Sequence, residues 1–490
     1  MNGKEPSILE YLFPRLRDIL FISIFIAVML LGGRMLNMDG DLPRHLLTGK
    51  FILETRNIPT TEPFAYPYQG RPYVSHEWLT DIIFYLIYSF FGLTGIVILS
   101  AILLATTFYT LYAYTSSRFN LRIPPLFLVL WGAAATSLNW ITRPHLISML
   151  FLVVLLIWLD KLKEGEKIRL WRFPLLMLFW SNMHGEFIAG FLAMFACLAG
   201  WIWDYLFAEE SAQKDTGIKL LLVTVLSFLA SLLNPAGIGP WKTLLGFVNN
   251  RYLMSRMYEA NPPDFSQPEF MLLLGLLSFS VFLLAINKQK ISTPWALLLA
   301  GFSAMSLMAG RNIHLYGLVA AFVLPEAVNL PRNGRLLPSM ENSIVSIEKN
   351  LKGIFWPVMT SLACIMVMSR GPVHNIYRFD AHIFPIQATD WLIKHPQSGR
   401  LFNDINWGGY LALHLWPDQL VFADSMADTT GELTMEYENV ITLSPTRKEI
   451  LTDYQIEWAV IQPSSLLANA LEREGWKTIY DDQTAIILRK

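Results

Sequence analysis

The sequence predicts a polytopic α-helical membrane protein with about eleven transmembrane helices, followed by a soluble α/β domain. Two observations predict this class. Of the 490 residues, 53% are hydrophobic and only 16% are charged, against roughly 25% charged residues in typical soluble domains. In addition, long apolar runs recur along the chain up to Met368, and the composition changes after that residue.

The spanning helices are predicted from the length of the apolar runs. A bilayer core of about 30 Å requires roughly 20 apolar residues in each spanning helix. Several runs are shorter, but short helices can extend into their polar flanks. The segment Trp78–Phe91 is apolar too, and we expect it to lie along the membrane interface. The predicted spans are Ile19–Leu36, Gly92–Tyr114, Pro124–Asn139, Leu146–Leu159, Phe173–Trp180, Phe187–Tyr205, Ile218–Leu233, Phe270–Ile286, Trp295–Ala309, Ile313–Leu324 and Ile354–Met368.

Basic residues predict the orientation of these spans. Arg15, Arg17 and the basic cluster between Lys161 and Arg172 fall in loops on one side, and the opposite loops carry fewer. Cytoplasmic loops carry an excess of lysine and arginine. We therefore expect a multi-pass protein of the inner (plasma) membrane, with its N-terminus in the cytoplasm. No small-residue cleavage site follows the first apolar run, so the first helix is predicted to be uncleaved.

The chain is predicted to divide into two domains. Residues 1–369 form the transmembrane domain, whose first outer loop covers 37–77, and residues 370–490 form an extracytoplasmic α/β domain. Helical periodicity at Ile386–His395 is followed by alternating strand signals. The predicted strands are Gly399–Asp404, Gln419–Asp424, Trp458–Gln462 and a closing hairpin of Trp476–Asp481 with Thr484–Leu488.

Charge and motifs exclude one broad class of function. A net charge of -1 argues against a nucleic-acid binder, and the sequence contains neither zinc-knuckle spacing nor a phosphate-cradling glycine loop. Cys197 and Cys364 both lie in apolar runs, where they are expected to act as small hydrophobic residues.

Polar motifs gather on the predicted outer side. Ionisable groups at membrane depth are costly and are usually functional, so one outward-facing polar chamber is the economical explanation. Carboxylates and cations together suit the transfer of a sugar from a polyprenyl phosphate. A carboxylate would take the proton of an acceptor hydroxyl, while arginine and histidine would hold the charge of the departing phosphate. The candidate catalytic residues are Asp41, Asp39 and Glu77, and the candidate substrate-binding residues are Arg44, His45, His76, Arg143, His145, His184, Glu186, Arg311 and His314.

The motifs also resemble a known family. Asp41-Leu42-Pro43-Arg44-His45-Leu46-Leu47-Thr48-Gly49, His76-Glu77-Trp78-Leu79 and Asn406-Trp407-Gly408-Gly409-Tyr410 resemble bacterial glycosyltransferase-like membrane proteins of the GT-C superfamily. That superfamily includes protein O-mannosyltransferases, aminoarabinose transferases and oligosaccharyltransferases. The resemblance implies a catalytic acid in the first outer loop, matched by Asp41, and a polyprenyl-phosphate-linked sugar as donor. The chain has Leu42-Pro43-Arg44 in place of the paired aromatics that often follow this acid, so the resemblance does not define the acceptor site. It also lacks the Trp-Trp-Asp-Tyr-Gly signature of oligosaccharyltransferases, which favours transfer of a single sugar.

Other interpretations stay open. Asp39-Gly40-Asp41 also suits an ordinary turn, and His76-Glu77 also suits a helix cap. A metal site formed by His184, Glu186 and His145 is a minority alternative, so a divalent cation stays open as a cofactor. A lipid-linked glycan transporter or flippase would show paired broken helices in two related halves, which the sequence lacks. A non-catalytic scaffold in envelope polysaccharide assembly would not need acids and bases on one face. The sugar, the acceptor and the oligomeric state are not predicted.

Overall fold

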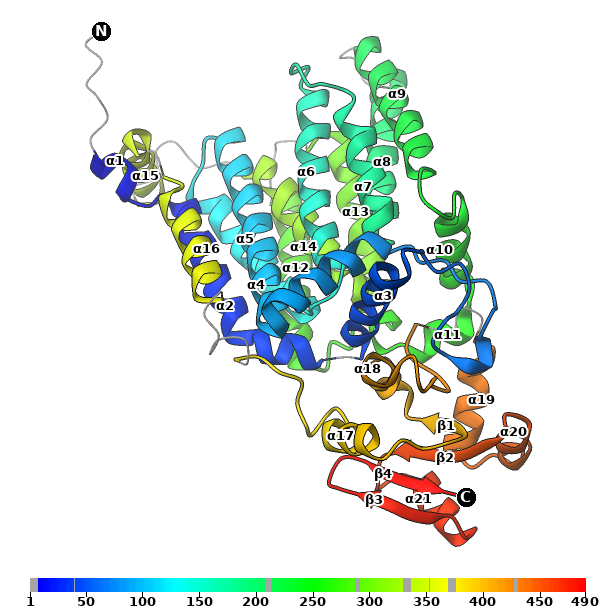
Figure 1. Ribbon diagram of the computed structural model, residues 1–490. Helices are drawn as coiled ribbons and strands as arrows, with labels where there is room; N and C mark the ends of the chain where they lie inside the picture. The colour runs from blue at the N-terminus through cyan, green and yellow to red at the C-terminus, as the bar shows by residue number, and fades with distance from the viewer. Residues whose placement is uncertain are drawn as a thin grey trace.

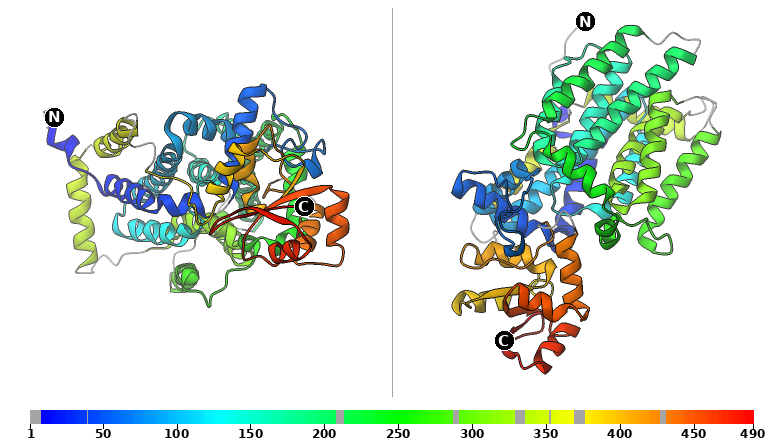
Figure 2. Two further views of the ribbon diagram at one scale, coloured as in Figure 1. Left: turned by 60° about the horizontal axis from the view of Figure 1, so that its bottom comes forward. Right: turned by 90° about the vertical axis from the view of Figure 1, so that its right-hand side faces the viewer.

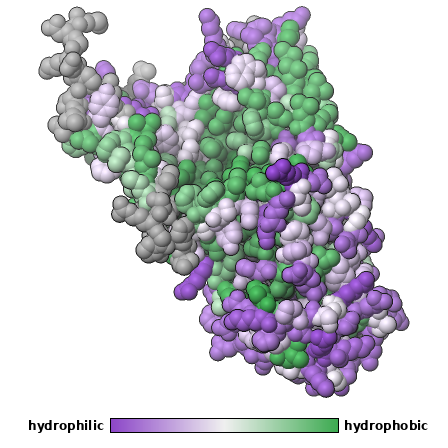
Figure 3. All heavy atoms as spheres, in the orientation of Figure 1, coloured by the Kyte–Doolittle hydropathy of each residue, from purple (hydrophilic) through white to green (hydrophobic). Residues whose placement is uncertain are grey.

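A computed structural model describes residues 8–38, 40–207, 213–286, 291–328, 336–351, 353–368, 376–426 and 431–490. A helical bundle makes up most of the molecule, and a smaller α/β unit lies beneath one end of it (Figures 1 and 2). Figure 3 shows apolar side chains gathered over the bundle and polar side chains over the α/β unit. This division of the surface agrees with a membrane-embedded part and a part in water.

Five helices are long and apolar enough to cross a membrane: Leu16–Asn37 (α2), Trp78–Arg118 (α4), His145–Lys163 (α6), Phe187–Phe207 (α8) and Pro268–Ile286, which contains α12 (Met271–Ile286). Shorter apolar helices lie at Ile123–Asn139, Thr293–Met308 and Phe355–Cys364. A multi-pass helical membrane protein is therefore the class that the structure supports, and the figure of about eleven spans stays a prediction.

The remaining helices lie within and around the bundle formed by these spans. α14 lies at the centre, since each of its residues is buried. It packs closely on α5, where a Cβ added at Gly132 or Gly317 would collide with the neighbouring helix. The bounds are Ile123–Thr136 for α5, Arg172–Met183 for α7, Lys214–Ser231 for α9, Gly239–Asn249 for α10, Arg251–Arg256 for α11, Thr293–Met308 for α13, Ile313–Val323 for α14, Leu337–Asn350 for α15 and Phe355–Met368 for α16; a short helix, α1, spans Ile8–Leu12.

Residues 37–77, the predicted first outer loop and here called the first outer region, are more ordered than predicted. Much of the predicted loop 37–77 is a helix, α3 (Asp41–Thr55), so Asp41 begins a helix and does not lie in a loop. After that region α4 runs for 41 residues but bends at Gly92, whose φ of 60° is one that glycine adopts readily. The bend falls between the predicted interface segment 78–91 and the predicted second span.

The C-terminal unit contains a four-stranded sheet in the order β1-β2-β4-β3. β1 (Arg400–Asn403) pairs in parallel with β2 (Ile456–Ile461), and β4 (Ile486–Arg489) pairs antiparallel with both β2 and β3 (Lys477–Asp481). The predicted strands at 399–404 and 458–462 and the closing hairpin are therefore confirmed. Its helices are α17 (Ile386–Lys394), α18 (Ile405–Leu415), α19 (Glu432–Ile441), α20 (Arg447–Asp453) and α21 (Leu466–Arg473).

One predicted strand is wrong. Gln419–Asp424 is not a strand, and only Val421 makes a bridge, with Ala65 of the first outer region. Val421, Phe422 and Ala423 are buried, which explains the apolar signal in the sequence. The segment is buried because it packs on the first outer region, and not because it lies in a sheet.

α18 and α3 are closely packed, and this contact joins the two parts of the molecule. A Cβ at Gly40 would collide with the backbone oxygen of Asn406, and one at Gly409 would lie 3.0 Å from the backbone oxygen of Gly40. Glycine at both positions lets the backbones approach. As a result the C-terminal unit lies directly beside Asp41.

Candidate functional site

Asp41 is the first residue of α3 and follows Gly40, which packs on Asn406 of the C-terminal unit. A carboxylate is favourable at this end of a helix because of the helix dipole. Its Oδ2 is 2.7 Å from Nη2 of Arg143. Burial would raise the pKa of Asp41, but the charge of Arg143 and a hydrogen bond from Ser425 outweigh it and lower that pKa. Asp41 is therefore a carboxylate at neutral pH.

Asp41 and Arg143 line a cavity of about 550 Å³. One part of its wall is charged, with Arg34, Arg256, Glu259, Asp264 and Glu269. Another part is apolar, with Leu138, Ile141, Phe270 and Ile313. Asn406 and Ser425 of the C-terminal unit complete the wall. The cavity therefore offers charged and apolar surfaces together, and it is closed by residues from both parts of the molecule.

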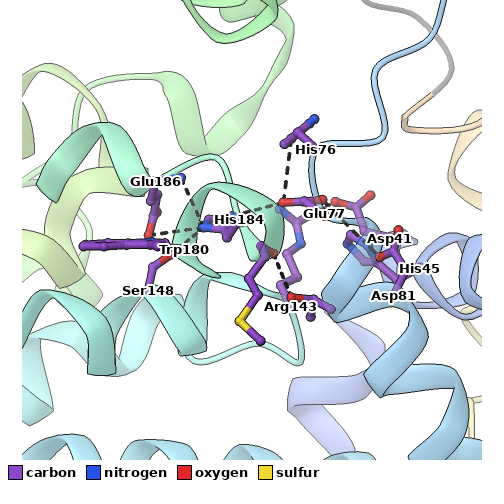
Figure 4. A network of polar contacts seen from close by, with 12 residues as sticks. Asp41, His45, His76, Glu77, Asp81, Arg143, Ser148, Trp180, His184 and Glu186 are labelled. Atoms are coloured by element: carbon purple, nitrogen blue, oxygen red, sulfur yellow. Dashed lines mark hydrogen bonds and ion pairs between the residues drawn. The ribbon is translucent and has the colours of Figure 1, made fainter. Parts of the chain in front are cut away.

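A chain of histidines and carboxylates extends away from Asp41 into the bundle (Figure 4). Oε1 of Glu77 is 3.3 Å from Nε2 of His184 and 3.8 Å from Nε2 of His76. On its other ring nitrogen, His184 lies 3.6 Å from Glu186. Burial would raise the pKa of Glu77, but His76, His45 and His184 together lower it.

The contacts of His184 determine which of its ring nitrogens carries the proton. The backbone N–H of Glu186 donates to His184 Nδ1 at 3.4 Å, and Ser148 Oγ, which accepts from Trp180 Nε1 at 2.7 Å, lies 2.8 Å from the same nitrogen. With Nδ1 as the acceptor, the proton of neutral His184 is on Nε2, 3.3 Å from Glu77. Burial lowers the pKa of His184 even though Glu186 and Glu77 oppose that change. His184 is thus neutral, with its ring proton on the side of Glu77.

His45 of α3 lies at the end of this chain of side chains that contacts α4. Its Nδ1 is 2.7 Å from Oδ1 of Asp81 and 3.8 Å from Oε2 of Glu77. Burial alone would lower the pKa of His45, but the carboxylates of Asp81 and Glu77 outweigh it and raise the pKa to about 9. His45 is therefore a buried cation that orders the carboxylates beside Asp41.

Glu186, His314 and His145 form the other end of the chain. Nε2 of His314 is 3.0 Å from Oε1 of Glu186, and the rings of His145 and His314 are 5.3 Å apart. Burial would raise the pKa of Glu186, but His314 and His184 lower it to about 2. Arg311, just before His314, acts electrostatically on both Asp41 and His184.

Arg44 is placed differently from the prediction. Its guanidinium is fully buried and lies 2.8 Å from Glu62 and 2.7 Å from Asp424. It also stacks over the ring of Phe64. Because its two outer nitrogens bind carboxylates of the protein, Arg44 joins the first outer region to the C-terminal unit and does not face the cavity. Asp39, the other predicted acid, lies outside the described residues.

The prediction from the sequence did not include several residues of the site. Asp81 follows Glu77 by four positions, a spacing that places both side chains on one face of a helix, so it could have been found. Glu259, 3.3 Å from Nη1 of Arg143, and Ser425 carry no comparable signal. Among the described residues, no group of three or more His, Cys, Asp or Glu side chains is arranged to hold a metal ion.

The fold and the site together define a helical membrane protein with a charged cavity at one end of its bundle. No protein-family model and no curated protein matches the sequence. Among solved structures, the chain is similar to the crystal structure of ArnT from Cupriavidus metallidurans bound to undecaprenyl phosphate. The identity is 12% and the TM-score 0.47, over 96% of this chain and 97% of that one. The likeness concerns the fold alone.

Proposed function

We propose that the protein is a glycosyltransferase that moves a sugar from a polyprenyl-phosphate-linked donor to a hydroxyl of an acceptor. The observation that carries this proposal is the pair of Asp41 and Arg143, a base and a phosphate-binding cation side by side in one cavity. General bases act by accepting the proton of an attacking hydroxyl, and arginine matches the geometry of phosphate oxygens.

An apolar groove beside the cavity supports a lipid donor. It has a volume of about 380 Å³ and is lined by Phe127, Leu130, Trp131 and Ala134 of α5 with Leu272 of α12. The same two helices lead into the cavity, because Leu138 follows α5 and Phe270 precedes α12. A polyprenyl chain in this groove would place its phosphate at the charged wall, where Arg143, Arg34 and Arg256 lie.

The reaction follows from the position of Asp41. Its carboxylate takes the proton of the acceptor hydroxyl while that oxygen forms a bond to the anomeric carbon of the sugar. The bond between the anomeric carbon and the phosphate oxygen breaks, and its electron pair stays on the phosphate. Arg143 stabilises the charge that develops there. Attack from the face opposite the leaving group inverts the anomeric carbon.

Arg143 also links donor binding to the strength of the base. In the structure it contacts Asp41 and Glu259 and lowers the pKa of Asp41. A donor phosphate would compete for the same guanidinium. Asp41 would then lose part of its charge partner, and its pKa would rise toward that of an effective base. The carboxylate would thus be activated when the donor is present.

We further propose that the reaction takes place on the outer face of the inner membrane, with residues 370–490 as an extracytoplasmic domain over the site. The lysine and arginine distribution supports this orientation. Nucleotide sugars and ATP are absent from that side, so a lipid-linked sugar is the activated donor that such a site can use.

The test is donor consumption by the purified protein in proteoliposomes. A set of glycosyl undecaprenyl phosphates with different labelled sugars is supplied together with a mixture of glycan, lipid and peptide acceptors, and the release of undecaprenyl phosphate is measured against Asp41→Asn protein. We expect one donor or a few to be consumed by the native protein only. If a donor is bound or moved across the bilayer but never cleaved, the protein is a transporter, and the proposal is wrong.

A further inference from the structure

A second hollow lies beside the charged cavity, at one edge of the C-terminal sheet. It has a volume of about 460 Å³, within the usual range of small-molecule sites. β1 and β2 are parallel, so the residues after them, Asn406 and Gln462, meet at the same edge. Because β4 is antiparallel to β2 and Ile486 pairs with Ile461, the hairpin residues Gln483 and Thr484 reach this edge too. In open α/β sheets ligands bind outside the carboxyl ends of the strands.

The wall of this hollow, here called the neutral groove, is polar but almost uncharged. Its polar residues are Asn37, Asn406, Gln462, Ser464, Gln483 and Thr484, and among the residues that the structure describes His382 is its one titratable member. Buried Trp407 and Phe384 form its floor. Within the described part of the chain, the side chains of Ser464 and Gln483 make no hydrogen bond, so both can bind a ligand. The charged cavity, by contrast, is lined by arginines and carboxylates.

This contrast indicates the chemistry of the ligand. Amide and hydroxyl groups both donate and accept hydrogen bonds, which matches the hydroxyls of a neutral sugar. A phosphate, a carboxylate or a cation bound in such a groove would have no charge partner among its described residues. The lipid headgroup is therefore expected in the charged cavity, and an uncharged polyhydroxyl ligand in the neutral groove.

The two spaces meet near the catalytic base. Met38, Gly40 and Asn406 line both of them, and Gly40 directly precedes Asp41. A chain-like ligand in the neutral groove can therefore reach past Gly40 and present a terminal hydroxyl to the Asp41 carboxylate.

We infer that the neutral groove binds an uncharged glycan, and that this glycan is the acceptor of the reaction. The inference rests on the proposed function and gives it an acceptor class. It also assigns part of the specificity to the C-terminal unit, through Asn406, Gln462, Ser464 and Gln483, whereas the bundle binds the donor.

The experiment measures glycan binding by the full-length protein in detergent micelles. The probe is a printed array of neutral hexose and N-acetylhexosamine oligosaccharides together with sialylated and sulfated ones. Ser464→Trp fills the neutral groove, and Gln483→Ala removes a hydrogen-bond donor and acceptor from its wall. Ser398→Trp is the matched control, because Ser398 is exposed and precedes β1 at the opposite edge of the sheet.

We expect the native protein and Ser398→Trp to retain neutral glycans. Ser464→Trp should lower retention by about ten-fold or more, and Gln483→Ala by a few-fold, since one hydrogen bond contributes about 1 kcal/mol. Retention of no glycan, preferential retention of acidic glycans, or equal retention by Ser464→Trp and native protein would each overturn the inference. Binding requires no chemistry, so a failure here is distinct from a failure of donor consumption.

Discussion

At the scale of residues, the proposed reaction assigns donor binding chiefly to Arg143. It lies 2.7 Å from Asp41 and lines the charged cavity. Its planar fork can bind two phosphate oxygens at once, which lysine cannot do. Arg143→Lys should therefore raise the KM for the lipid-linked donor by about ten-fold or more, the loss expected for a charged hydrogen bond. Steady-state kinetics over a range of donor concentrations measure this.

The matched control for Arg143→Lys is Arg71→Lys. Arg71 also forms an arginine–carboxylate pair, with Glu432, but both side chains are exposed and neither lines the charged cavity. Its KM should not change. An unchanged KM in Arg143→Lys would mean that the phosphate binds elsewhere in the cavity.

The pair of His45 and Asp81 predicts a dependence of stability on pH. The pKa of His45 is about 9 in the folded protein, above its ordinary value of 6.5. A raised pKa means that the folded state binds the proton more tightly, so the stabilisation is complete below about pH 6.5. It is lost as the pH rises through about 9. Thermal unfolding of the purified protein between about pH 6 and 10 should show this loss.

Asp81→Asn is the informative variant for this prediction. It removes the charge that holds the proton on His45 but keeps a hydrogen-bonding group of similar size. Its unfolding temperature should vary less with pH in this range than that of the native protein. A variant with the native pH dependence would show that another group titrates there.

At the scale of elements, the contact between α18 and α3 places the C-terminal unit on the site. A Cβ at Gly40, which precedes α3, would collide with the backbone oxygen of Asn406 in α18. Gly40→Ala should therefore destabilise the protein by about 1–3 kcal/mol, as overpacking does, and lower transfer. The control is Gly301→Ala in α13, where a Cβ would meet no atom within 4 Å. Equal unfolding temperatures for the two variants would contradict this account of the contact.

The sequence predicts most of the elements of the fold, and the exceptions have physical causes. The hydrophobic periodicity and the length of the segments were enough to predict β1, β2, the closing hairpin and α17. They failed at 419–424, because an apolar segment buried against another part of the chain has the same composition as a buried strand. They also failed at α3, because the arginine, proline and histidine near its start suited an outer loop.

The sequence was less informative about contacts within the site. It predicted that Asp41, Glu77, His184, Glu186 and His314 lie on the same side of the membrane, because each is at the end of an apolar run. It could not place Arg44, whose partner Asp424 is 380 positions away. A short motif shows which groups are available but not which of them pair, so the charge of Arg44 was assigned to the cavity.

At the scale of the whole molecule, the orientation in the membrane is the next prediction. The basic turn after α6 and the C-terminal unit lie at opposite ends of the bundle (Figure 1). With Cys197 and Cys364 replaced by alanine, a membrane-impermeant thiol reagent should label Ser398→Cys in intact cells. It should label Lys167→Cys only after the membrane is permeabilised. The reverse pattern would place the site in the cytoplasm and remove the argument for a lipid-linked donor.

The central claim is that Asp41 is the general base of a sugar transfer. The most direct measurement is the rate of sugar transfer from a labelled polyprenyl-phosphate donor by Asp41→Asn, Glu77→Gln and Glu186→Gln proteins of equal folding and donor binding. Removing a base costs on the order of 10²–10⁴ in rate, so Asp41→Asn should lose nearly all transfer while the other two lose less. Near-normal transfer by Asp41→Asn, with loss in Glu77→Gln or Glu186→Gln, would contradict the claim and place the base elsewhere along the histidine–carboxylate chain.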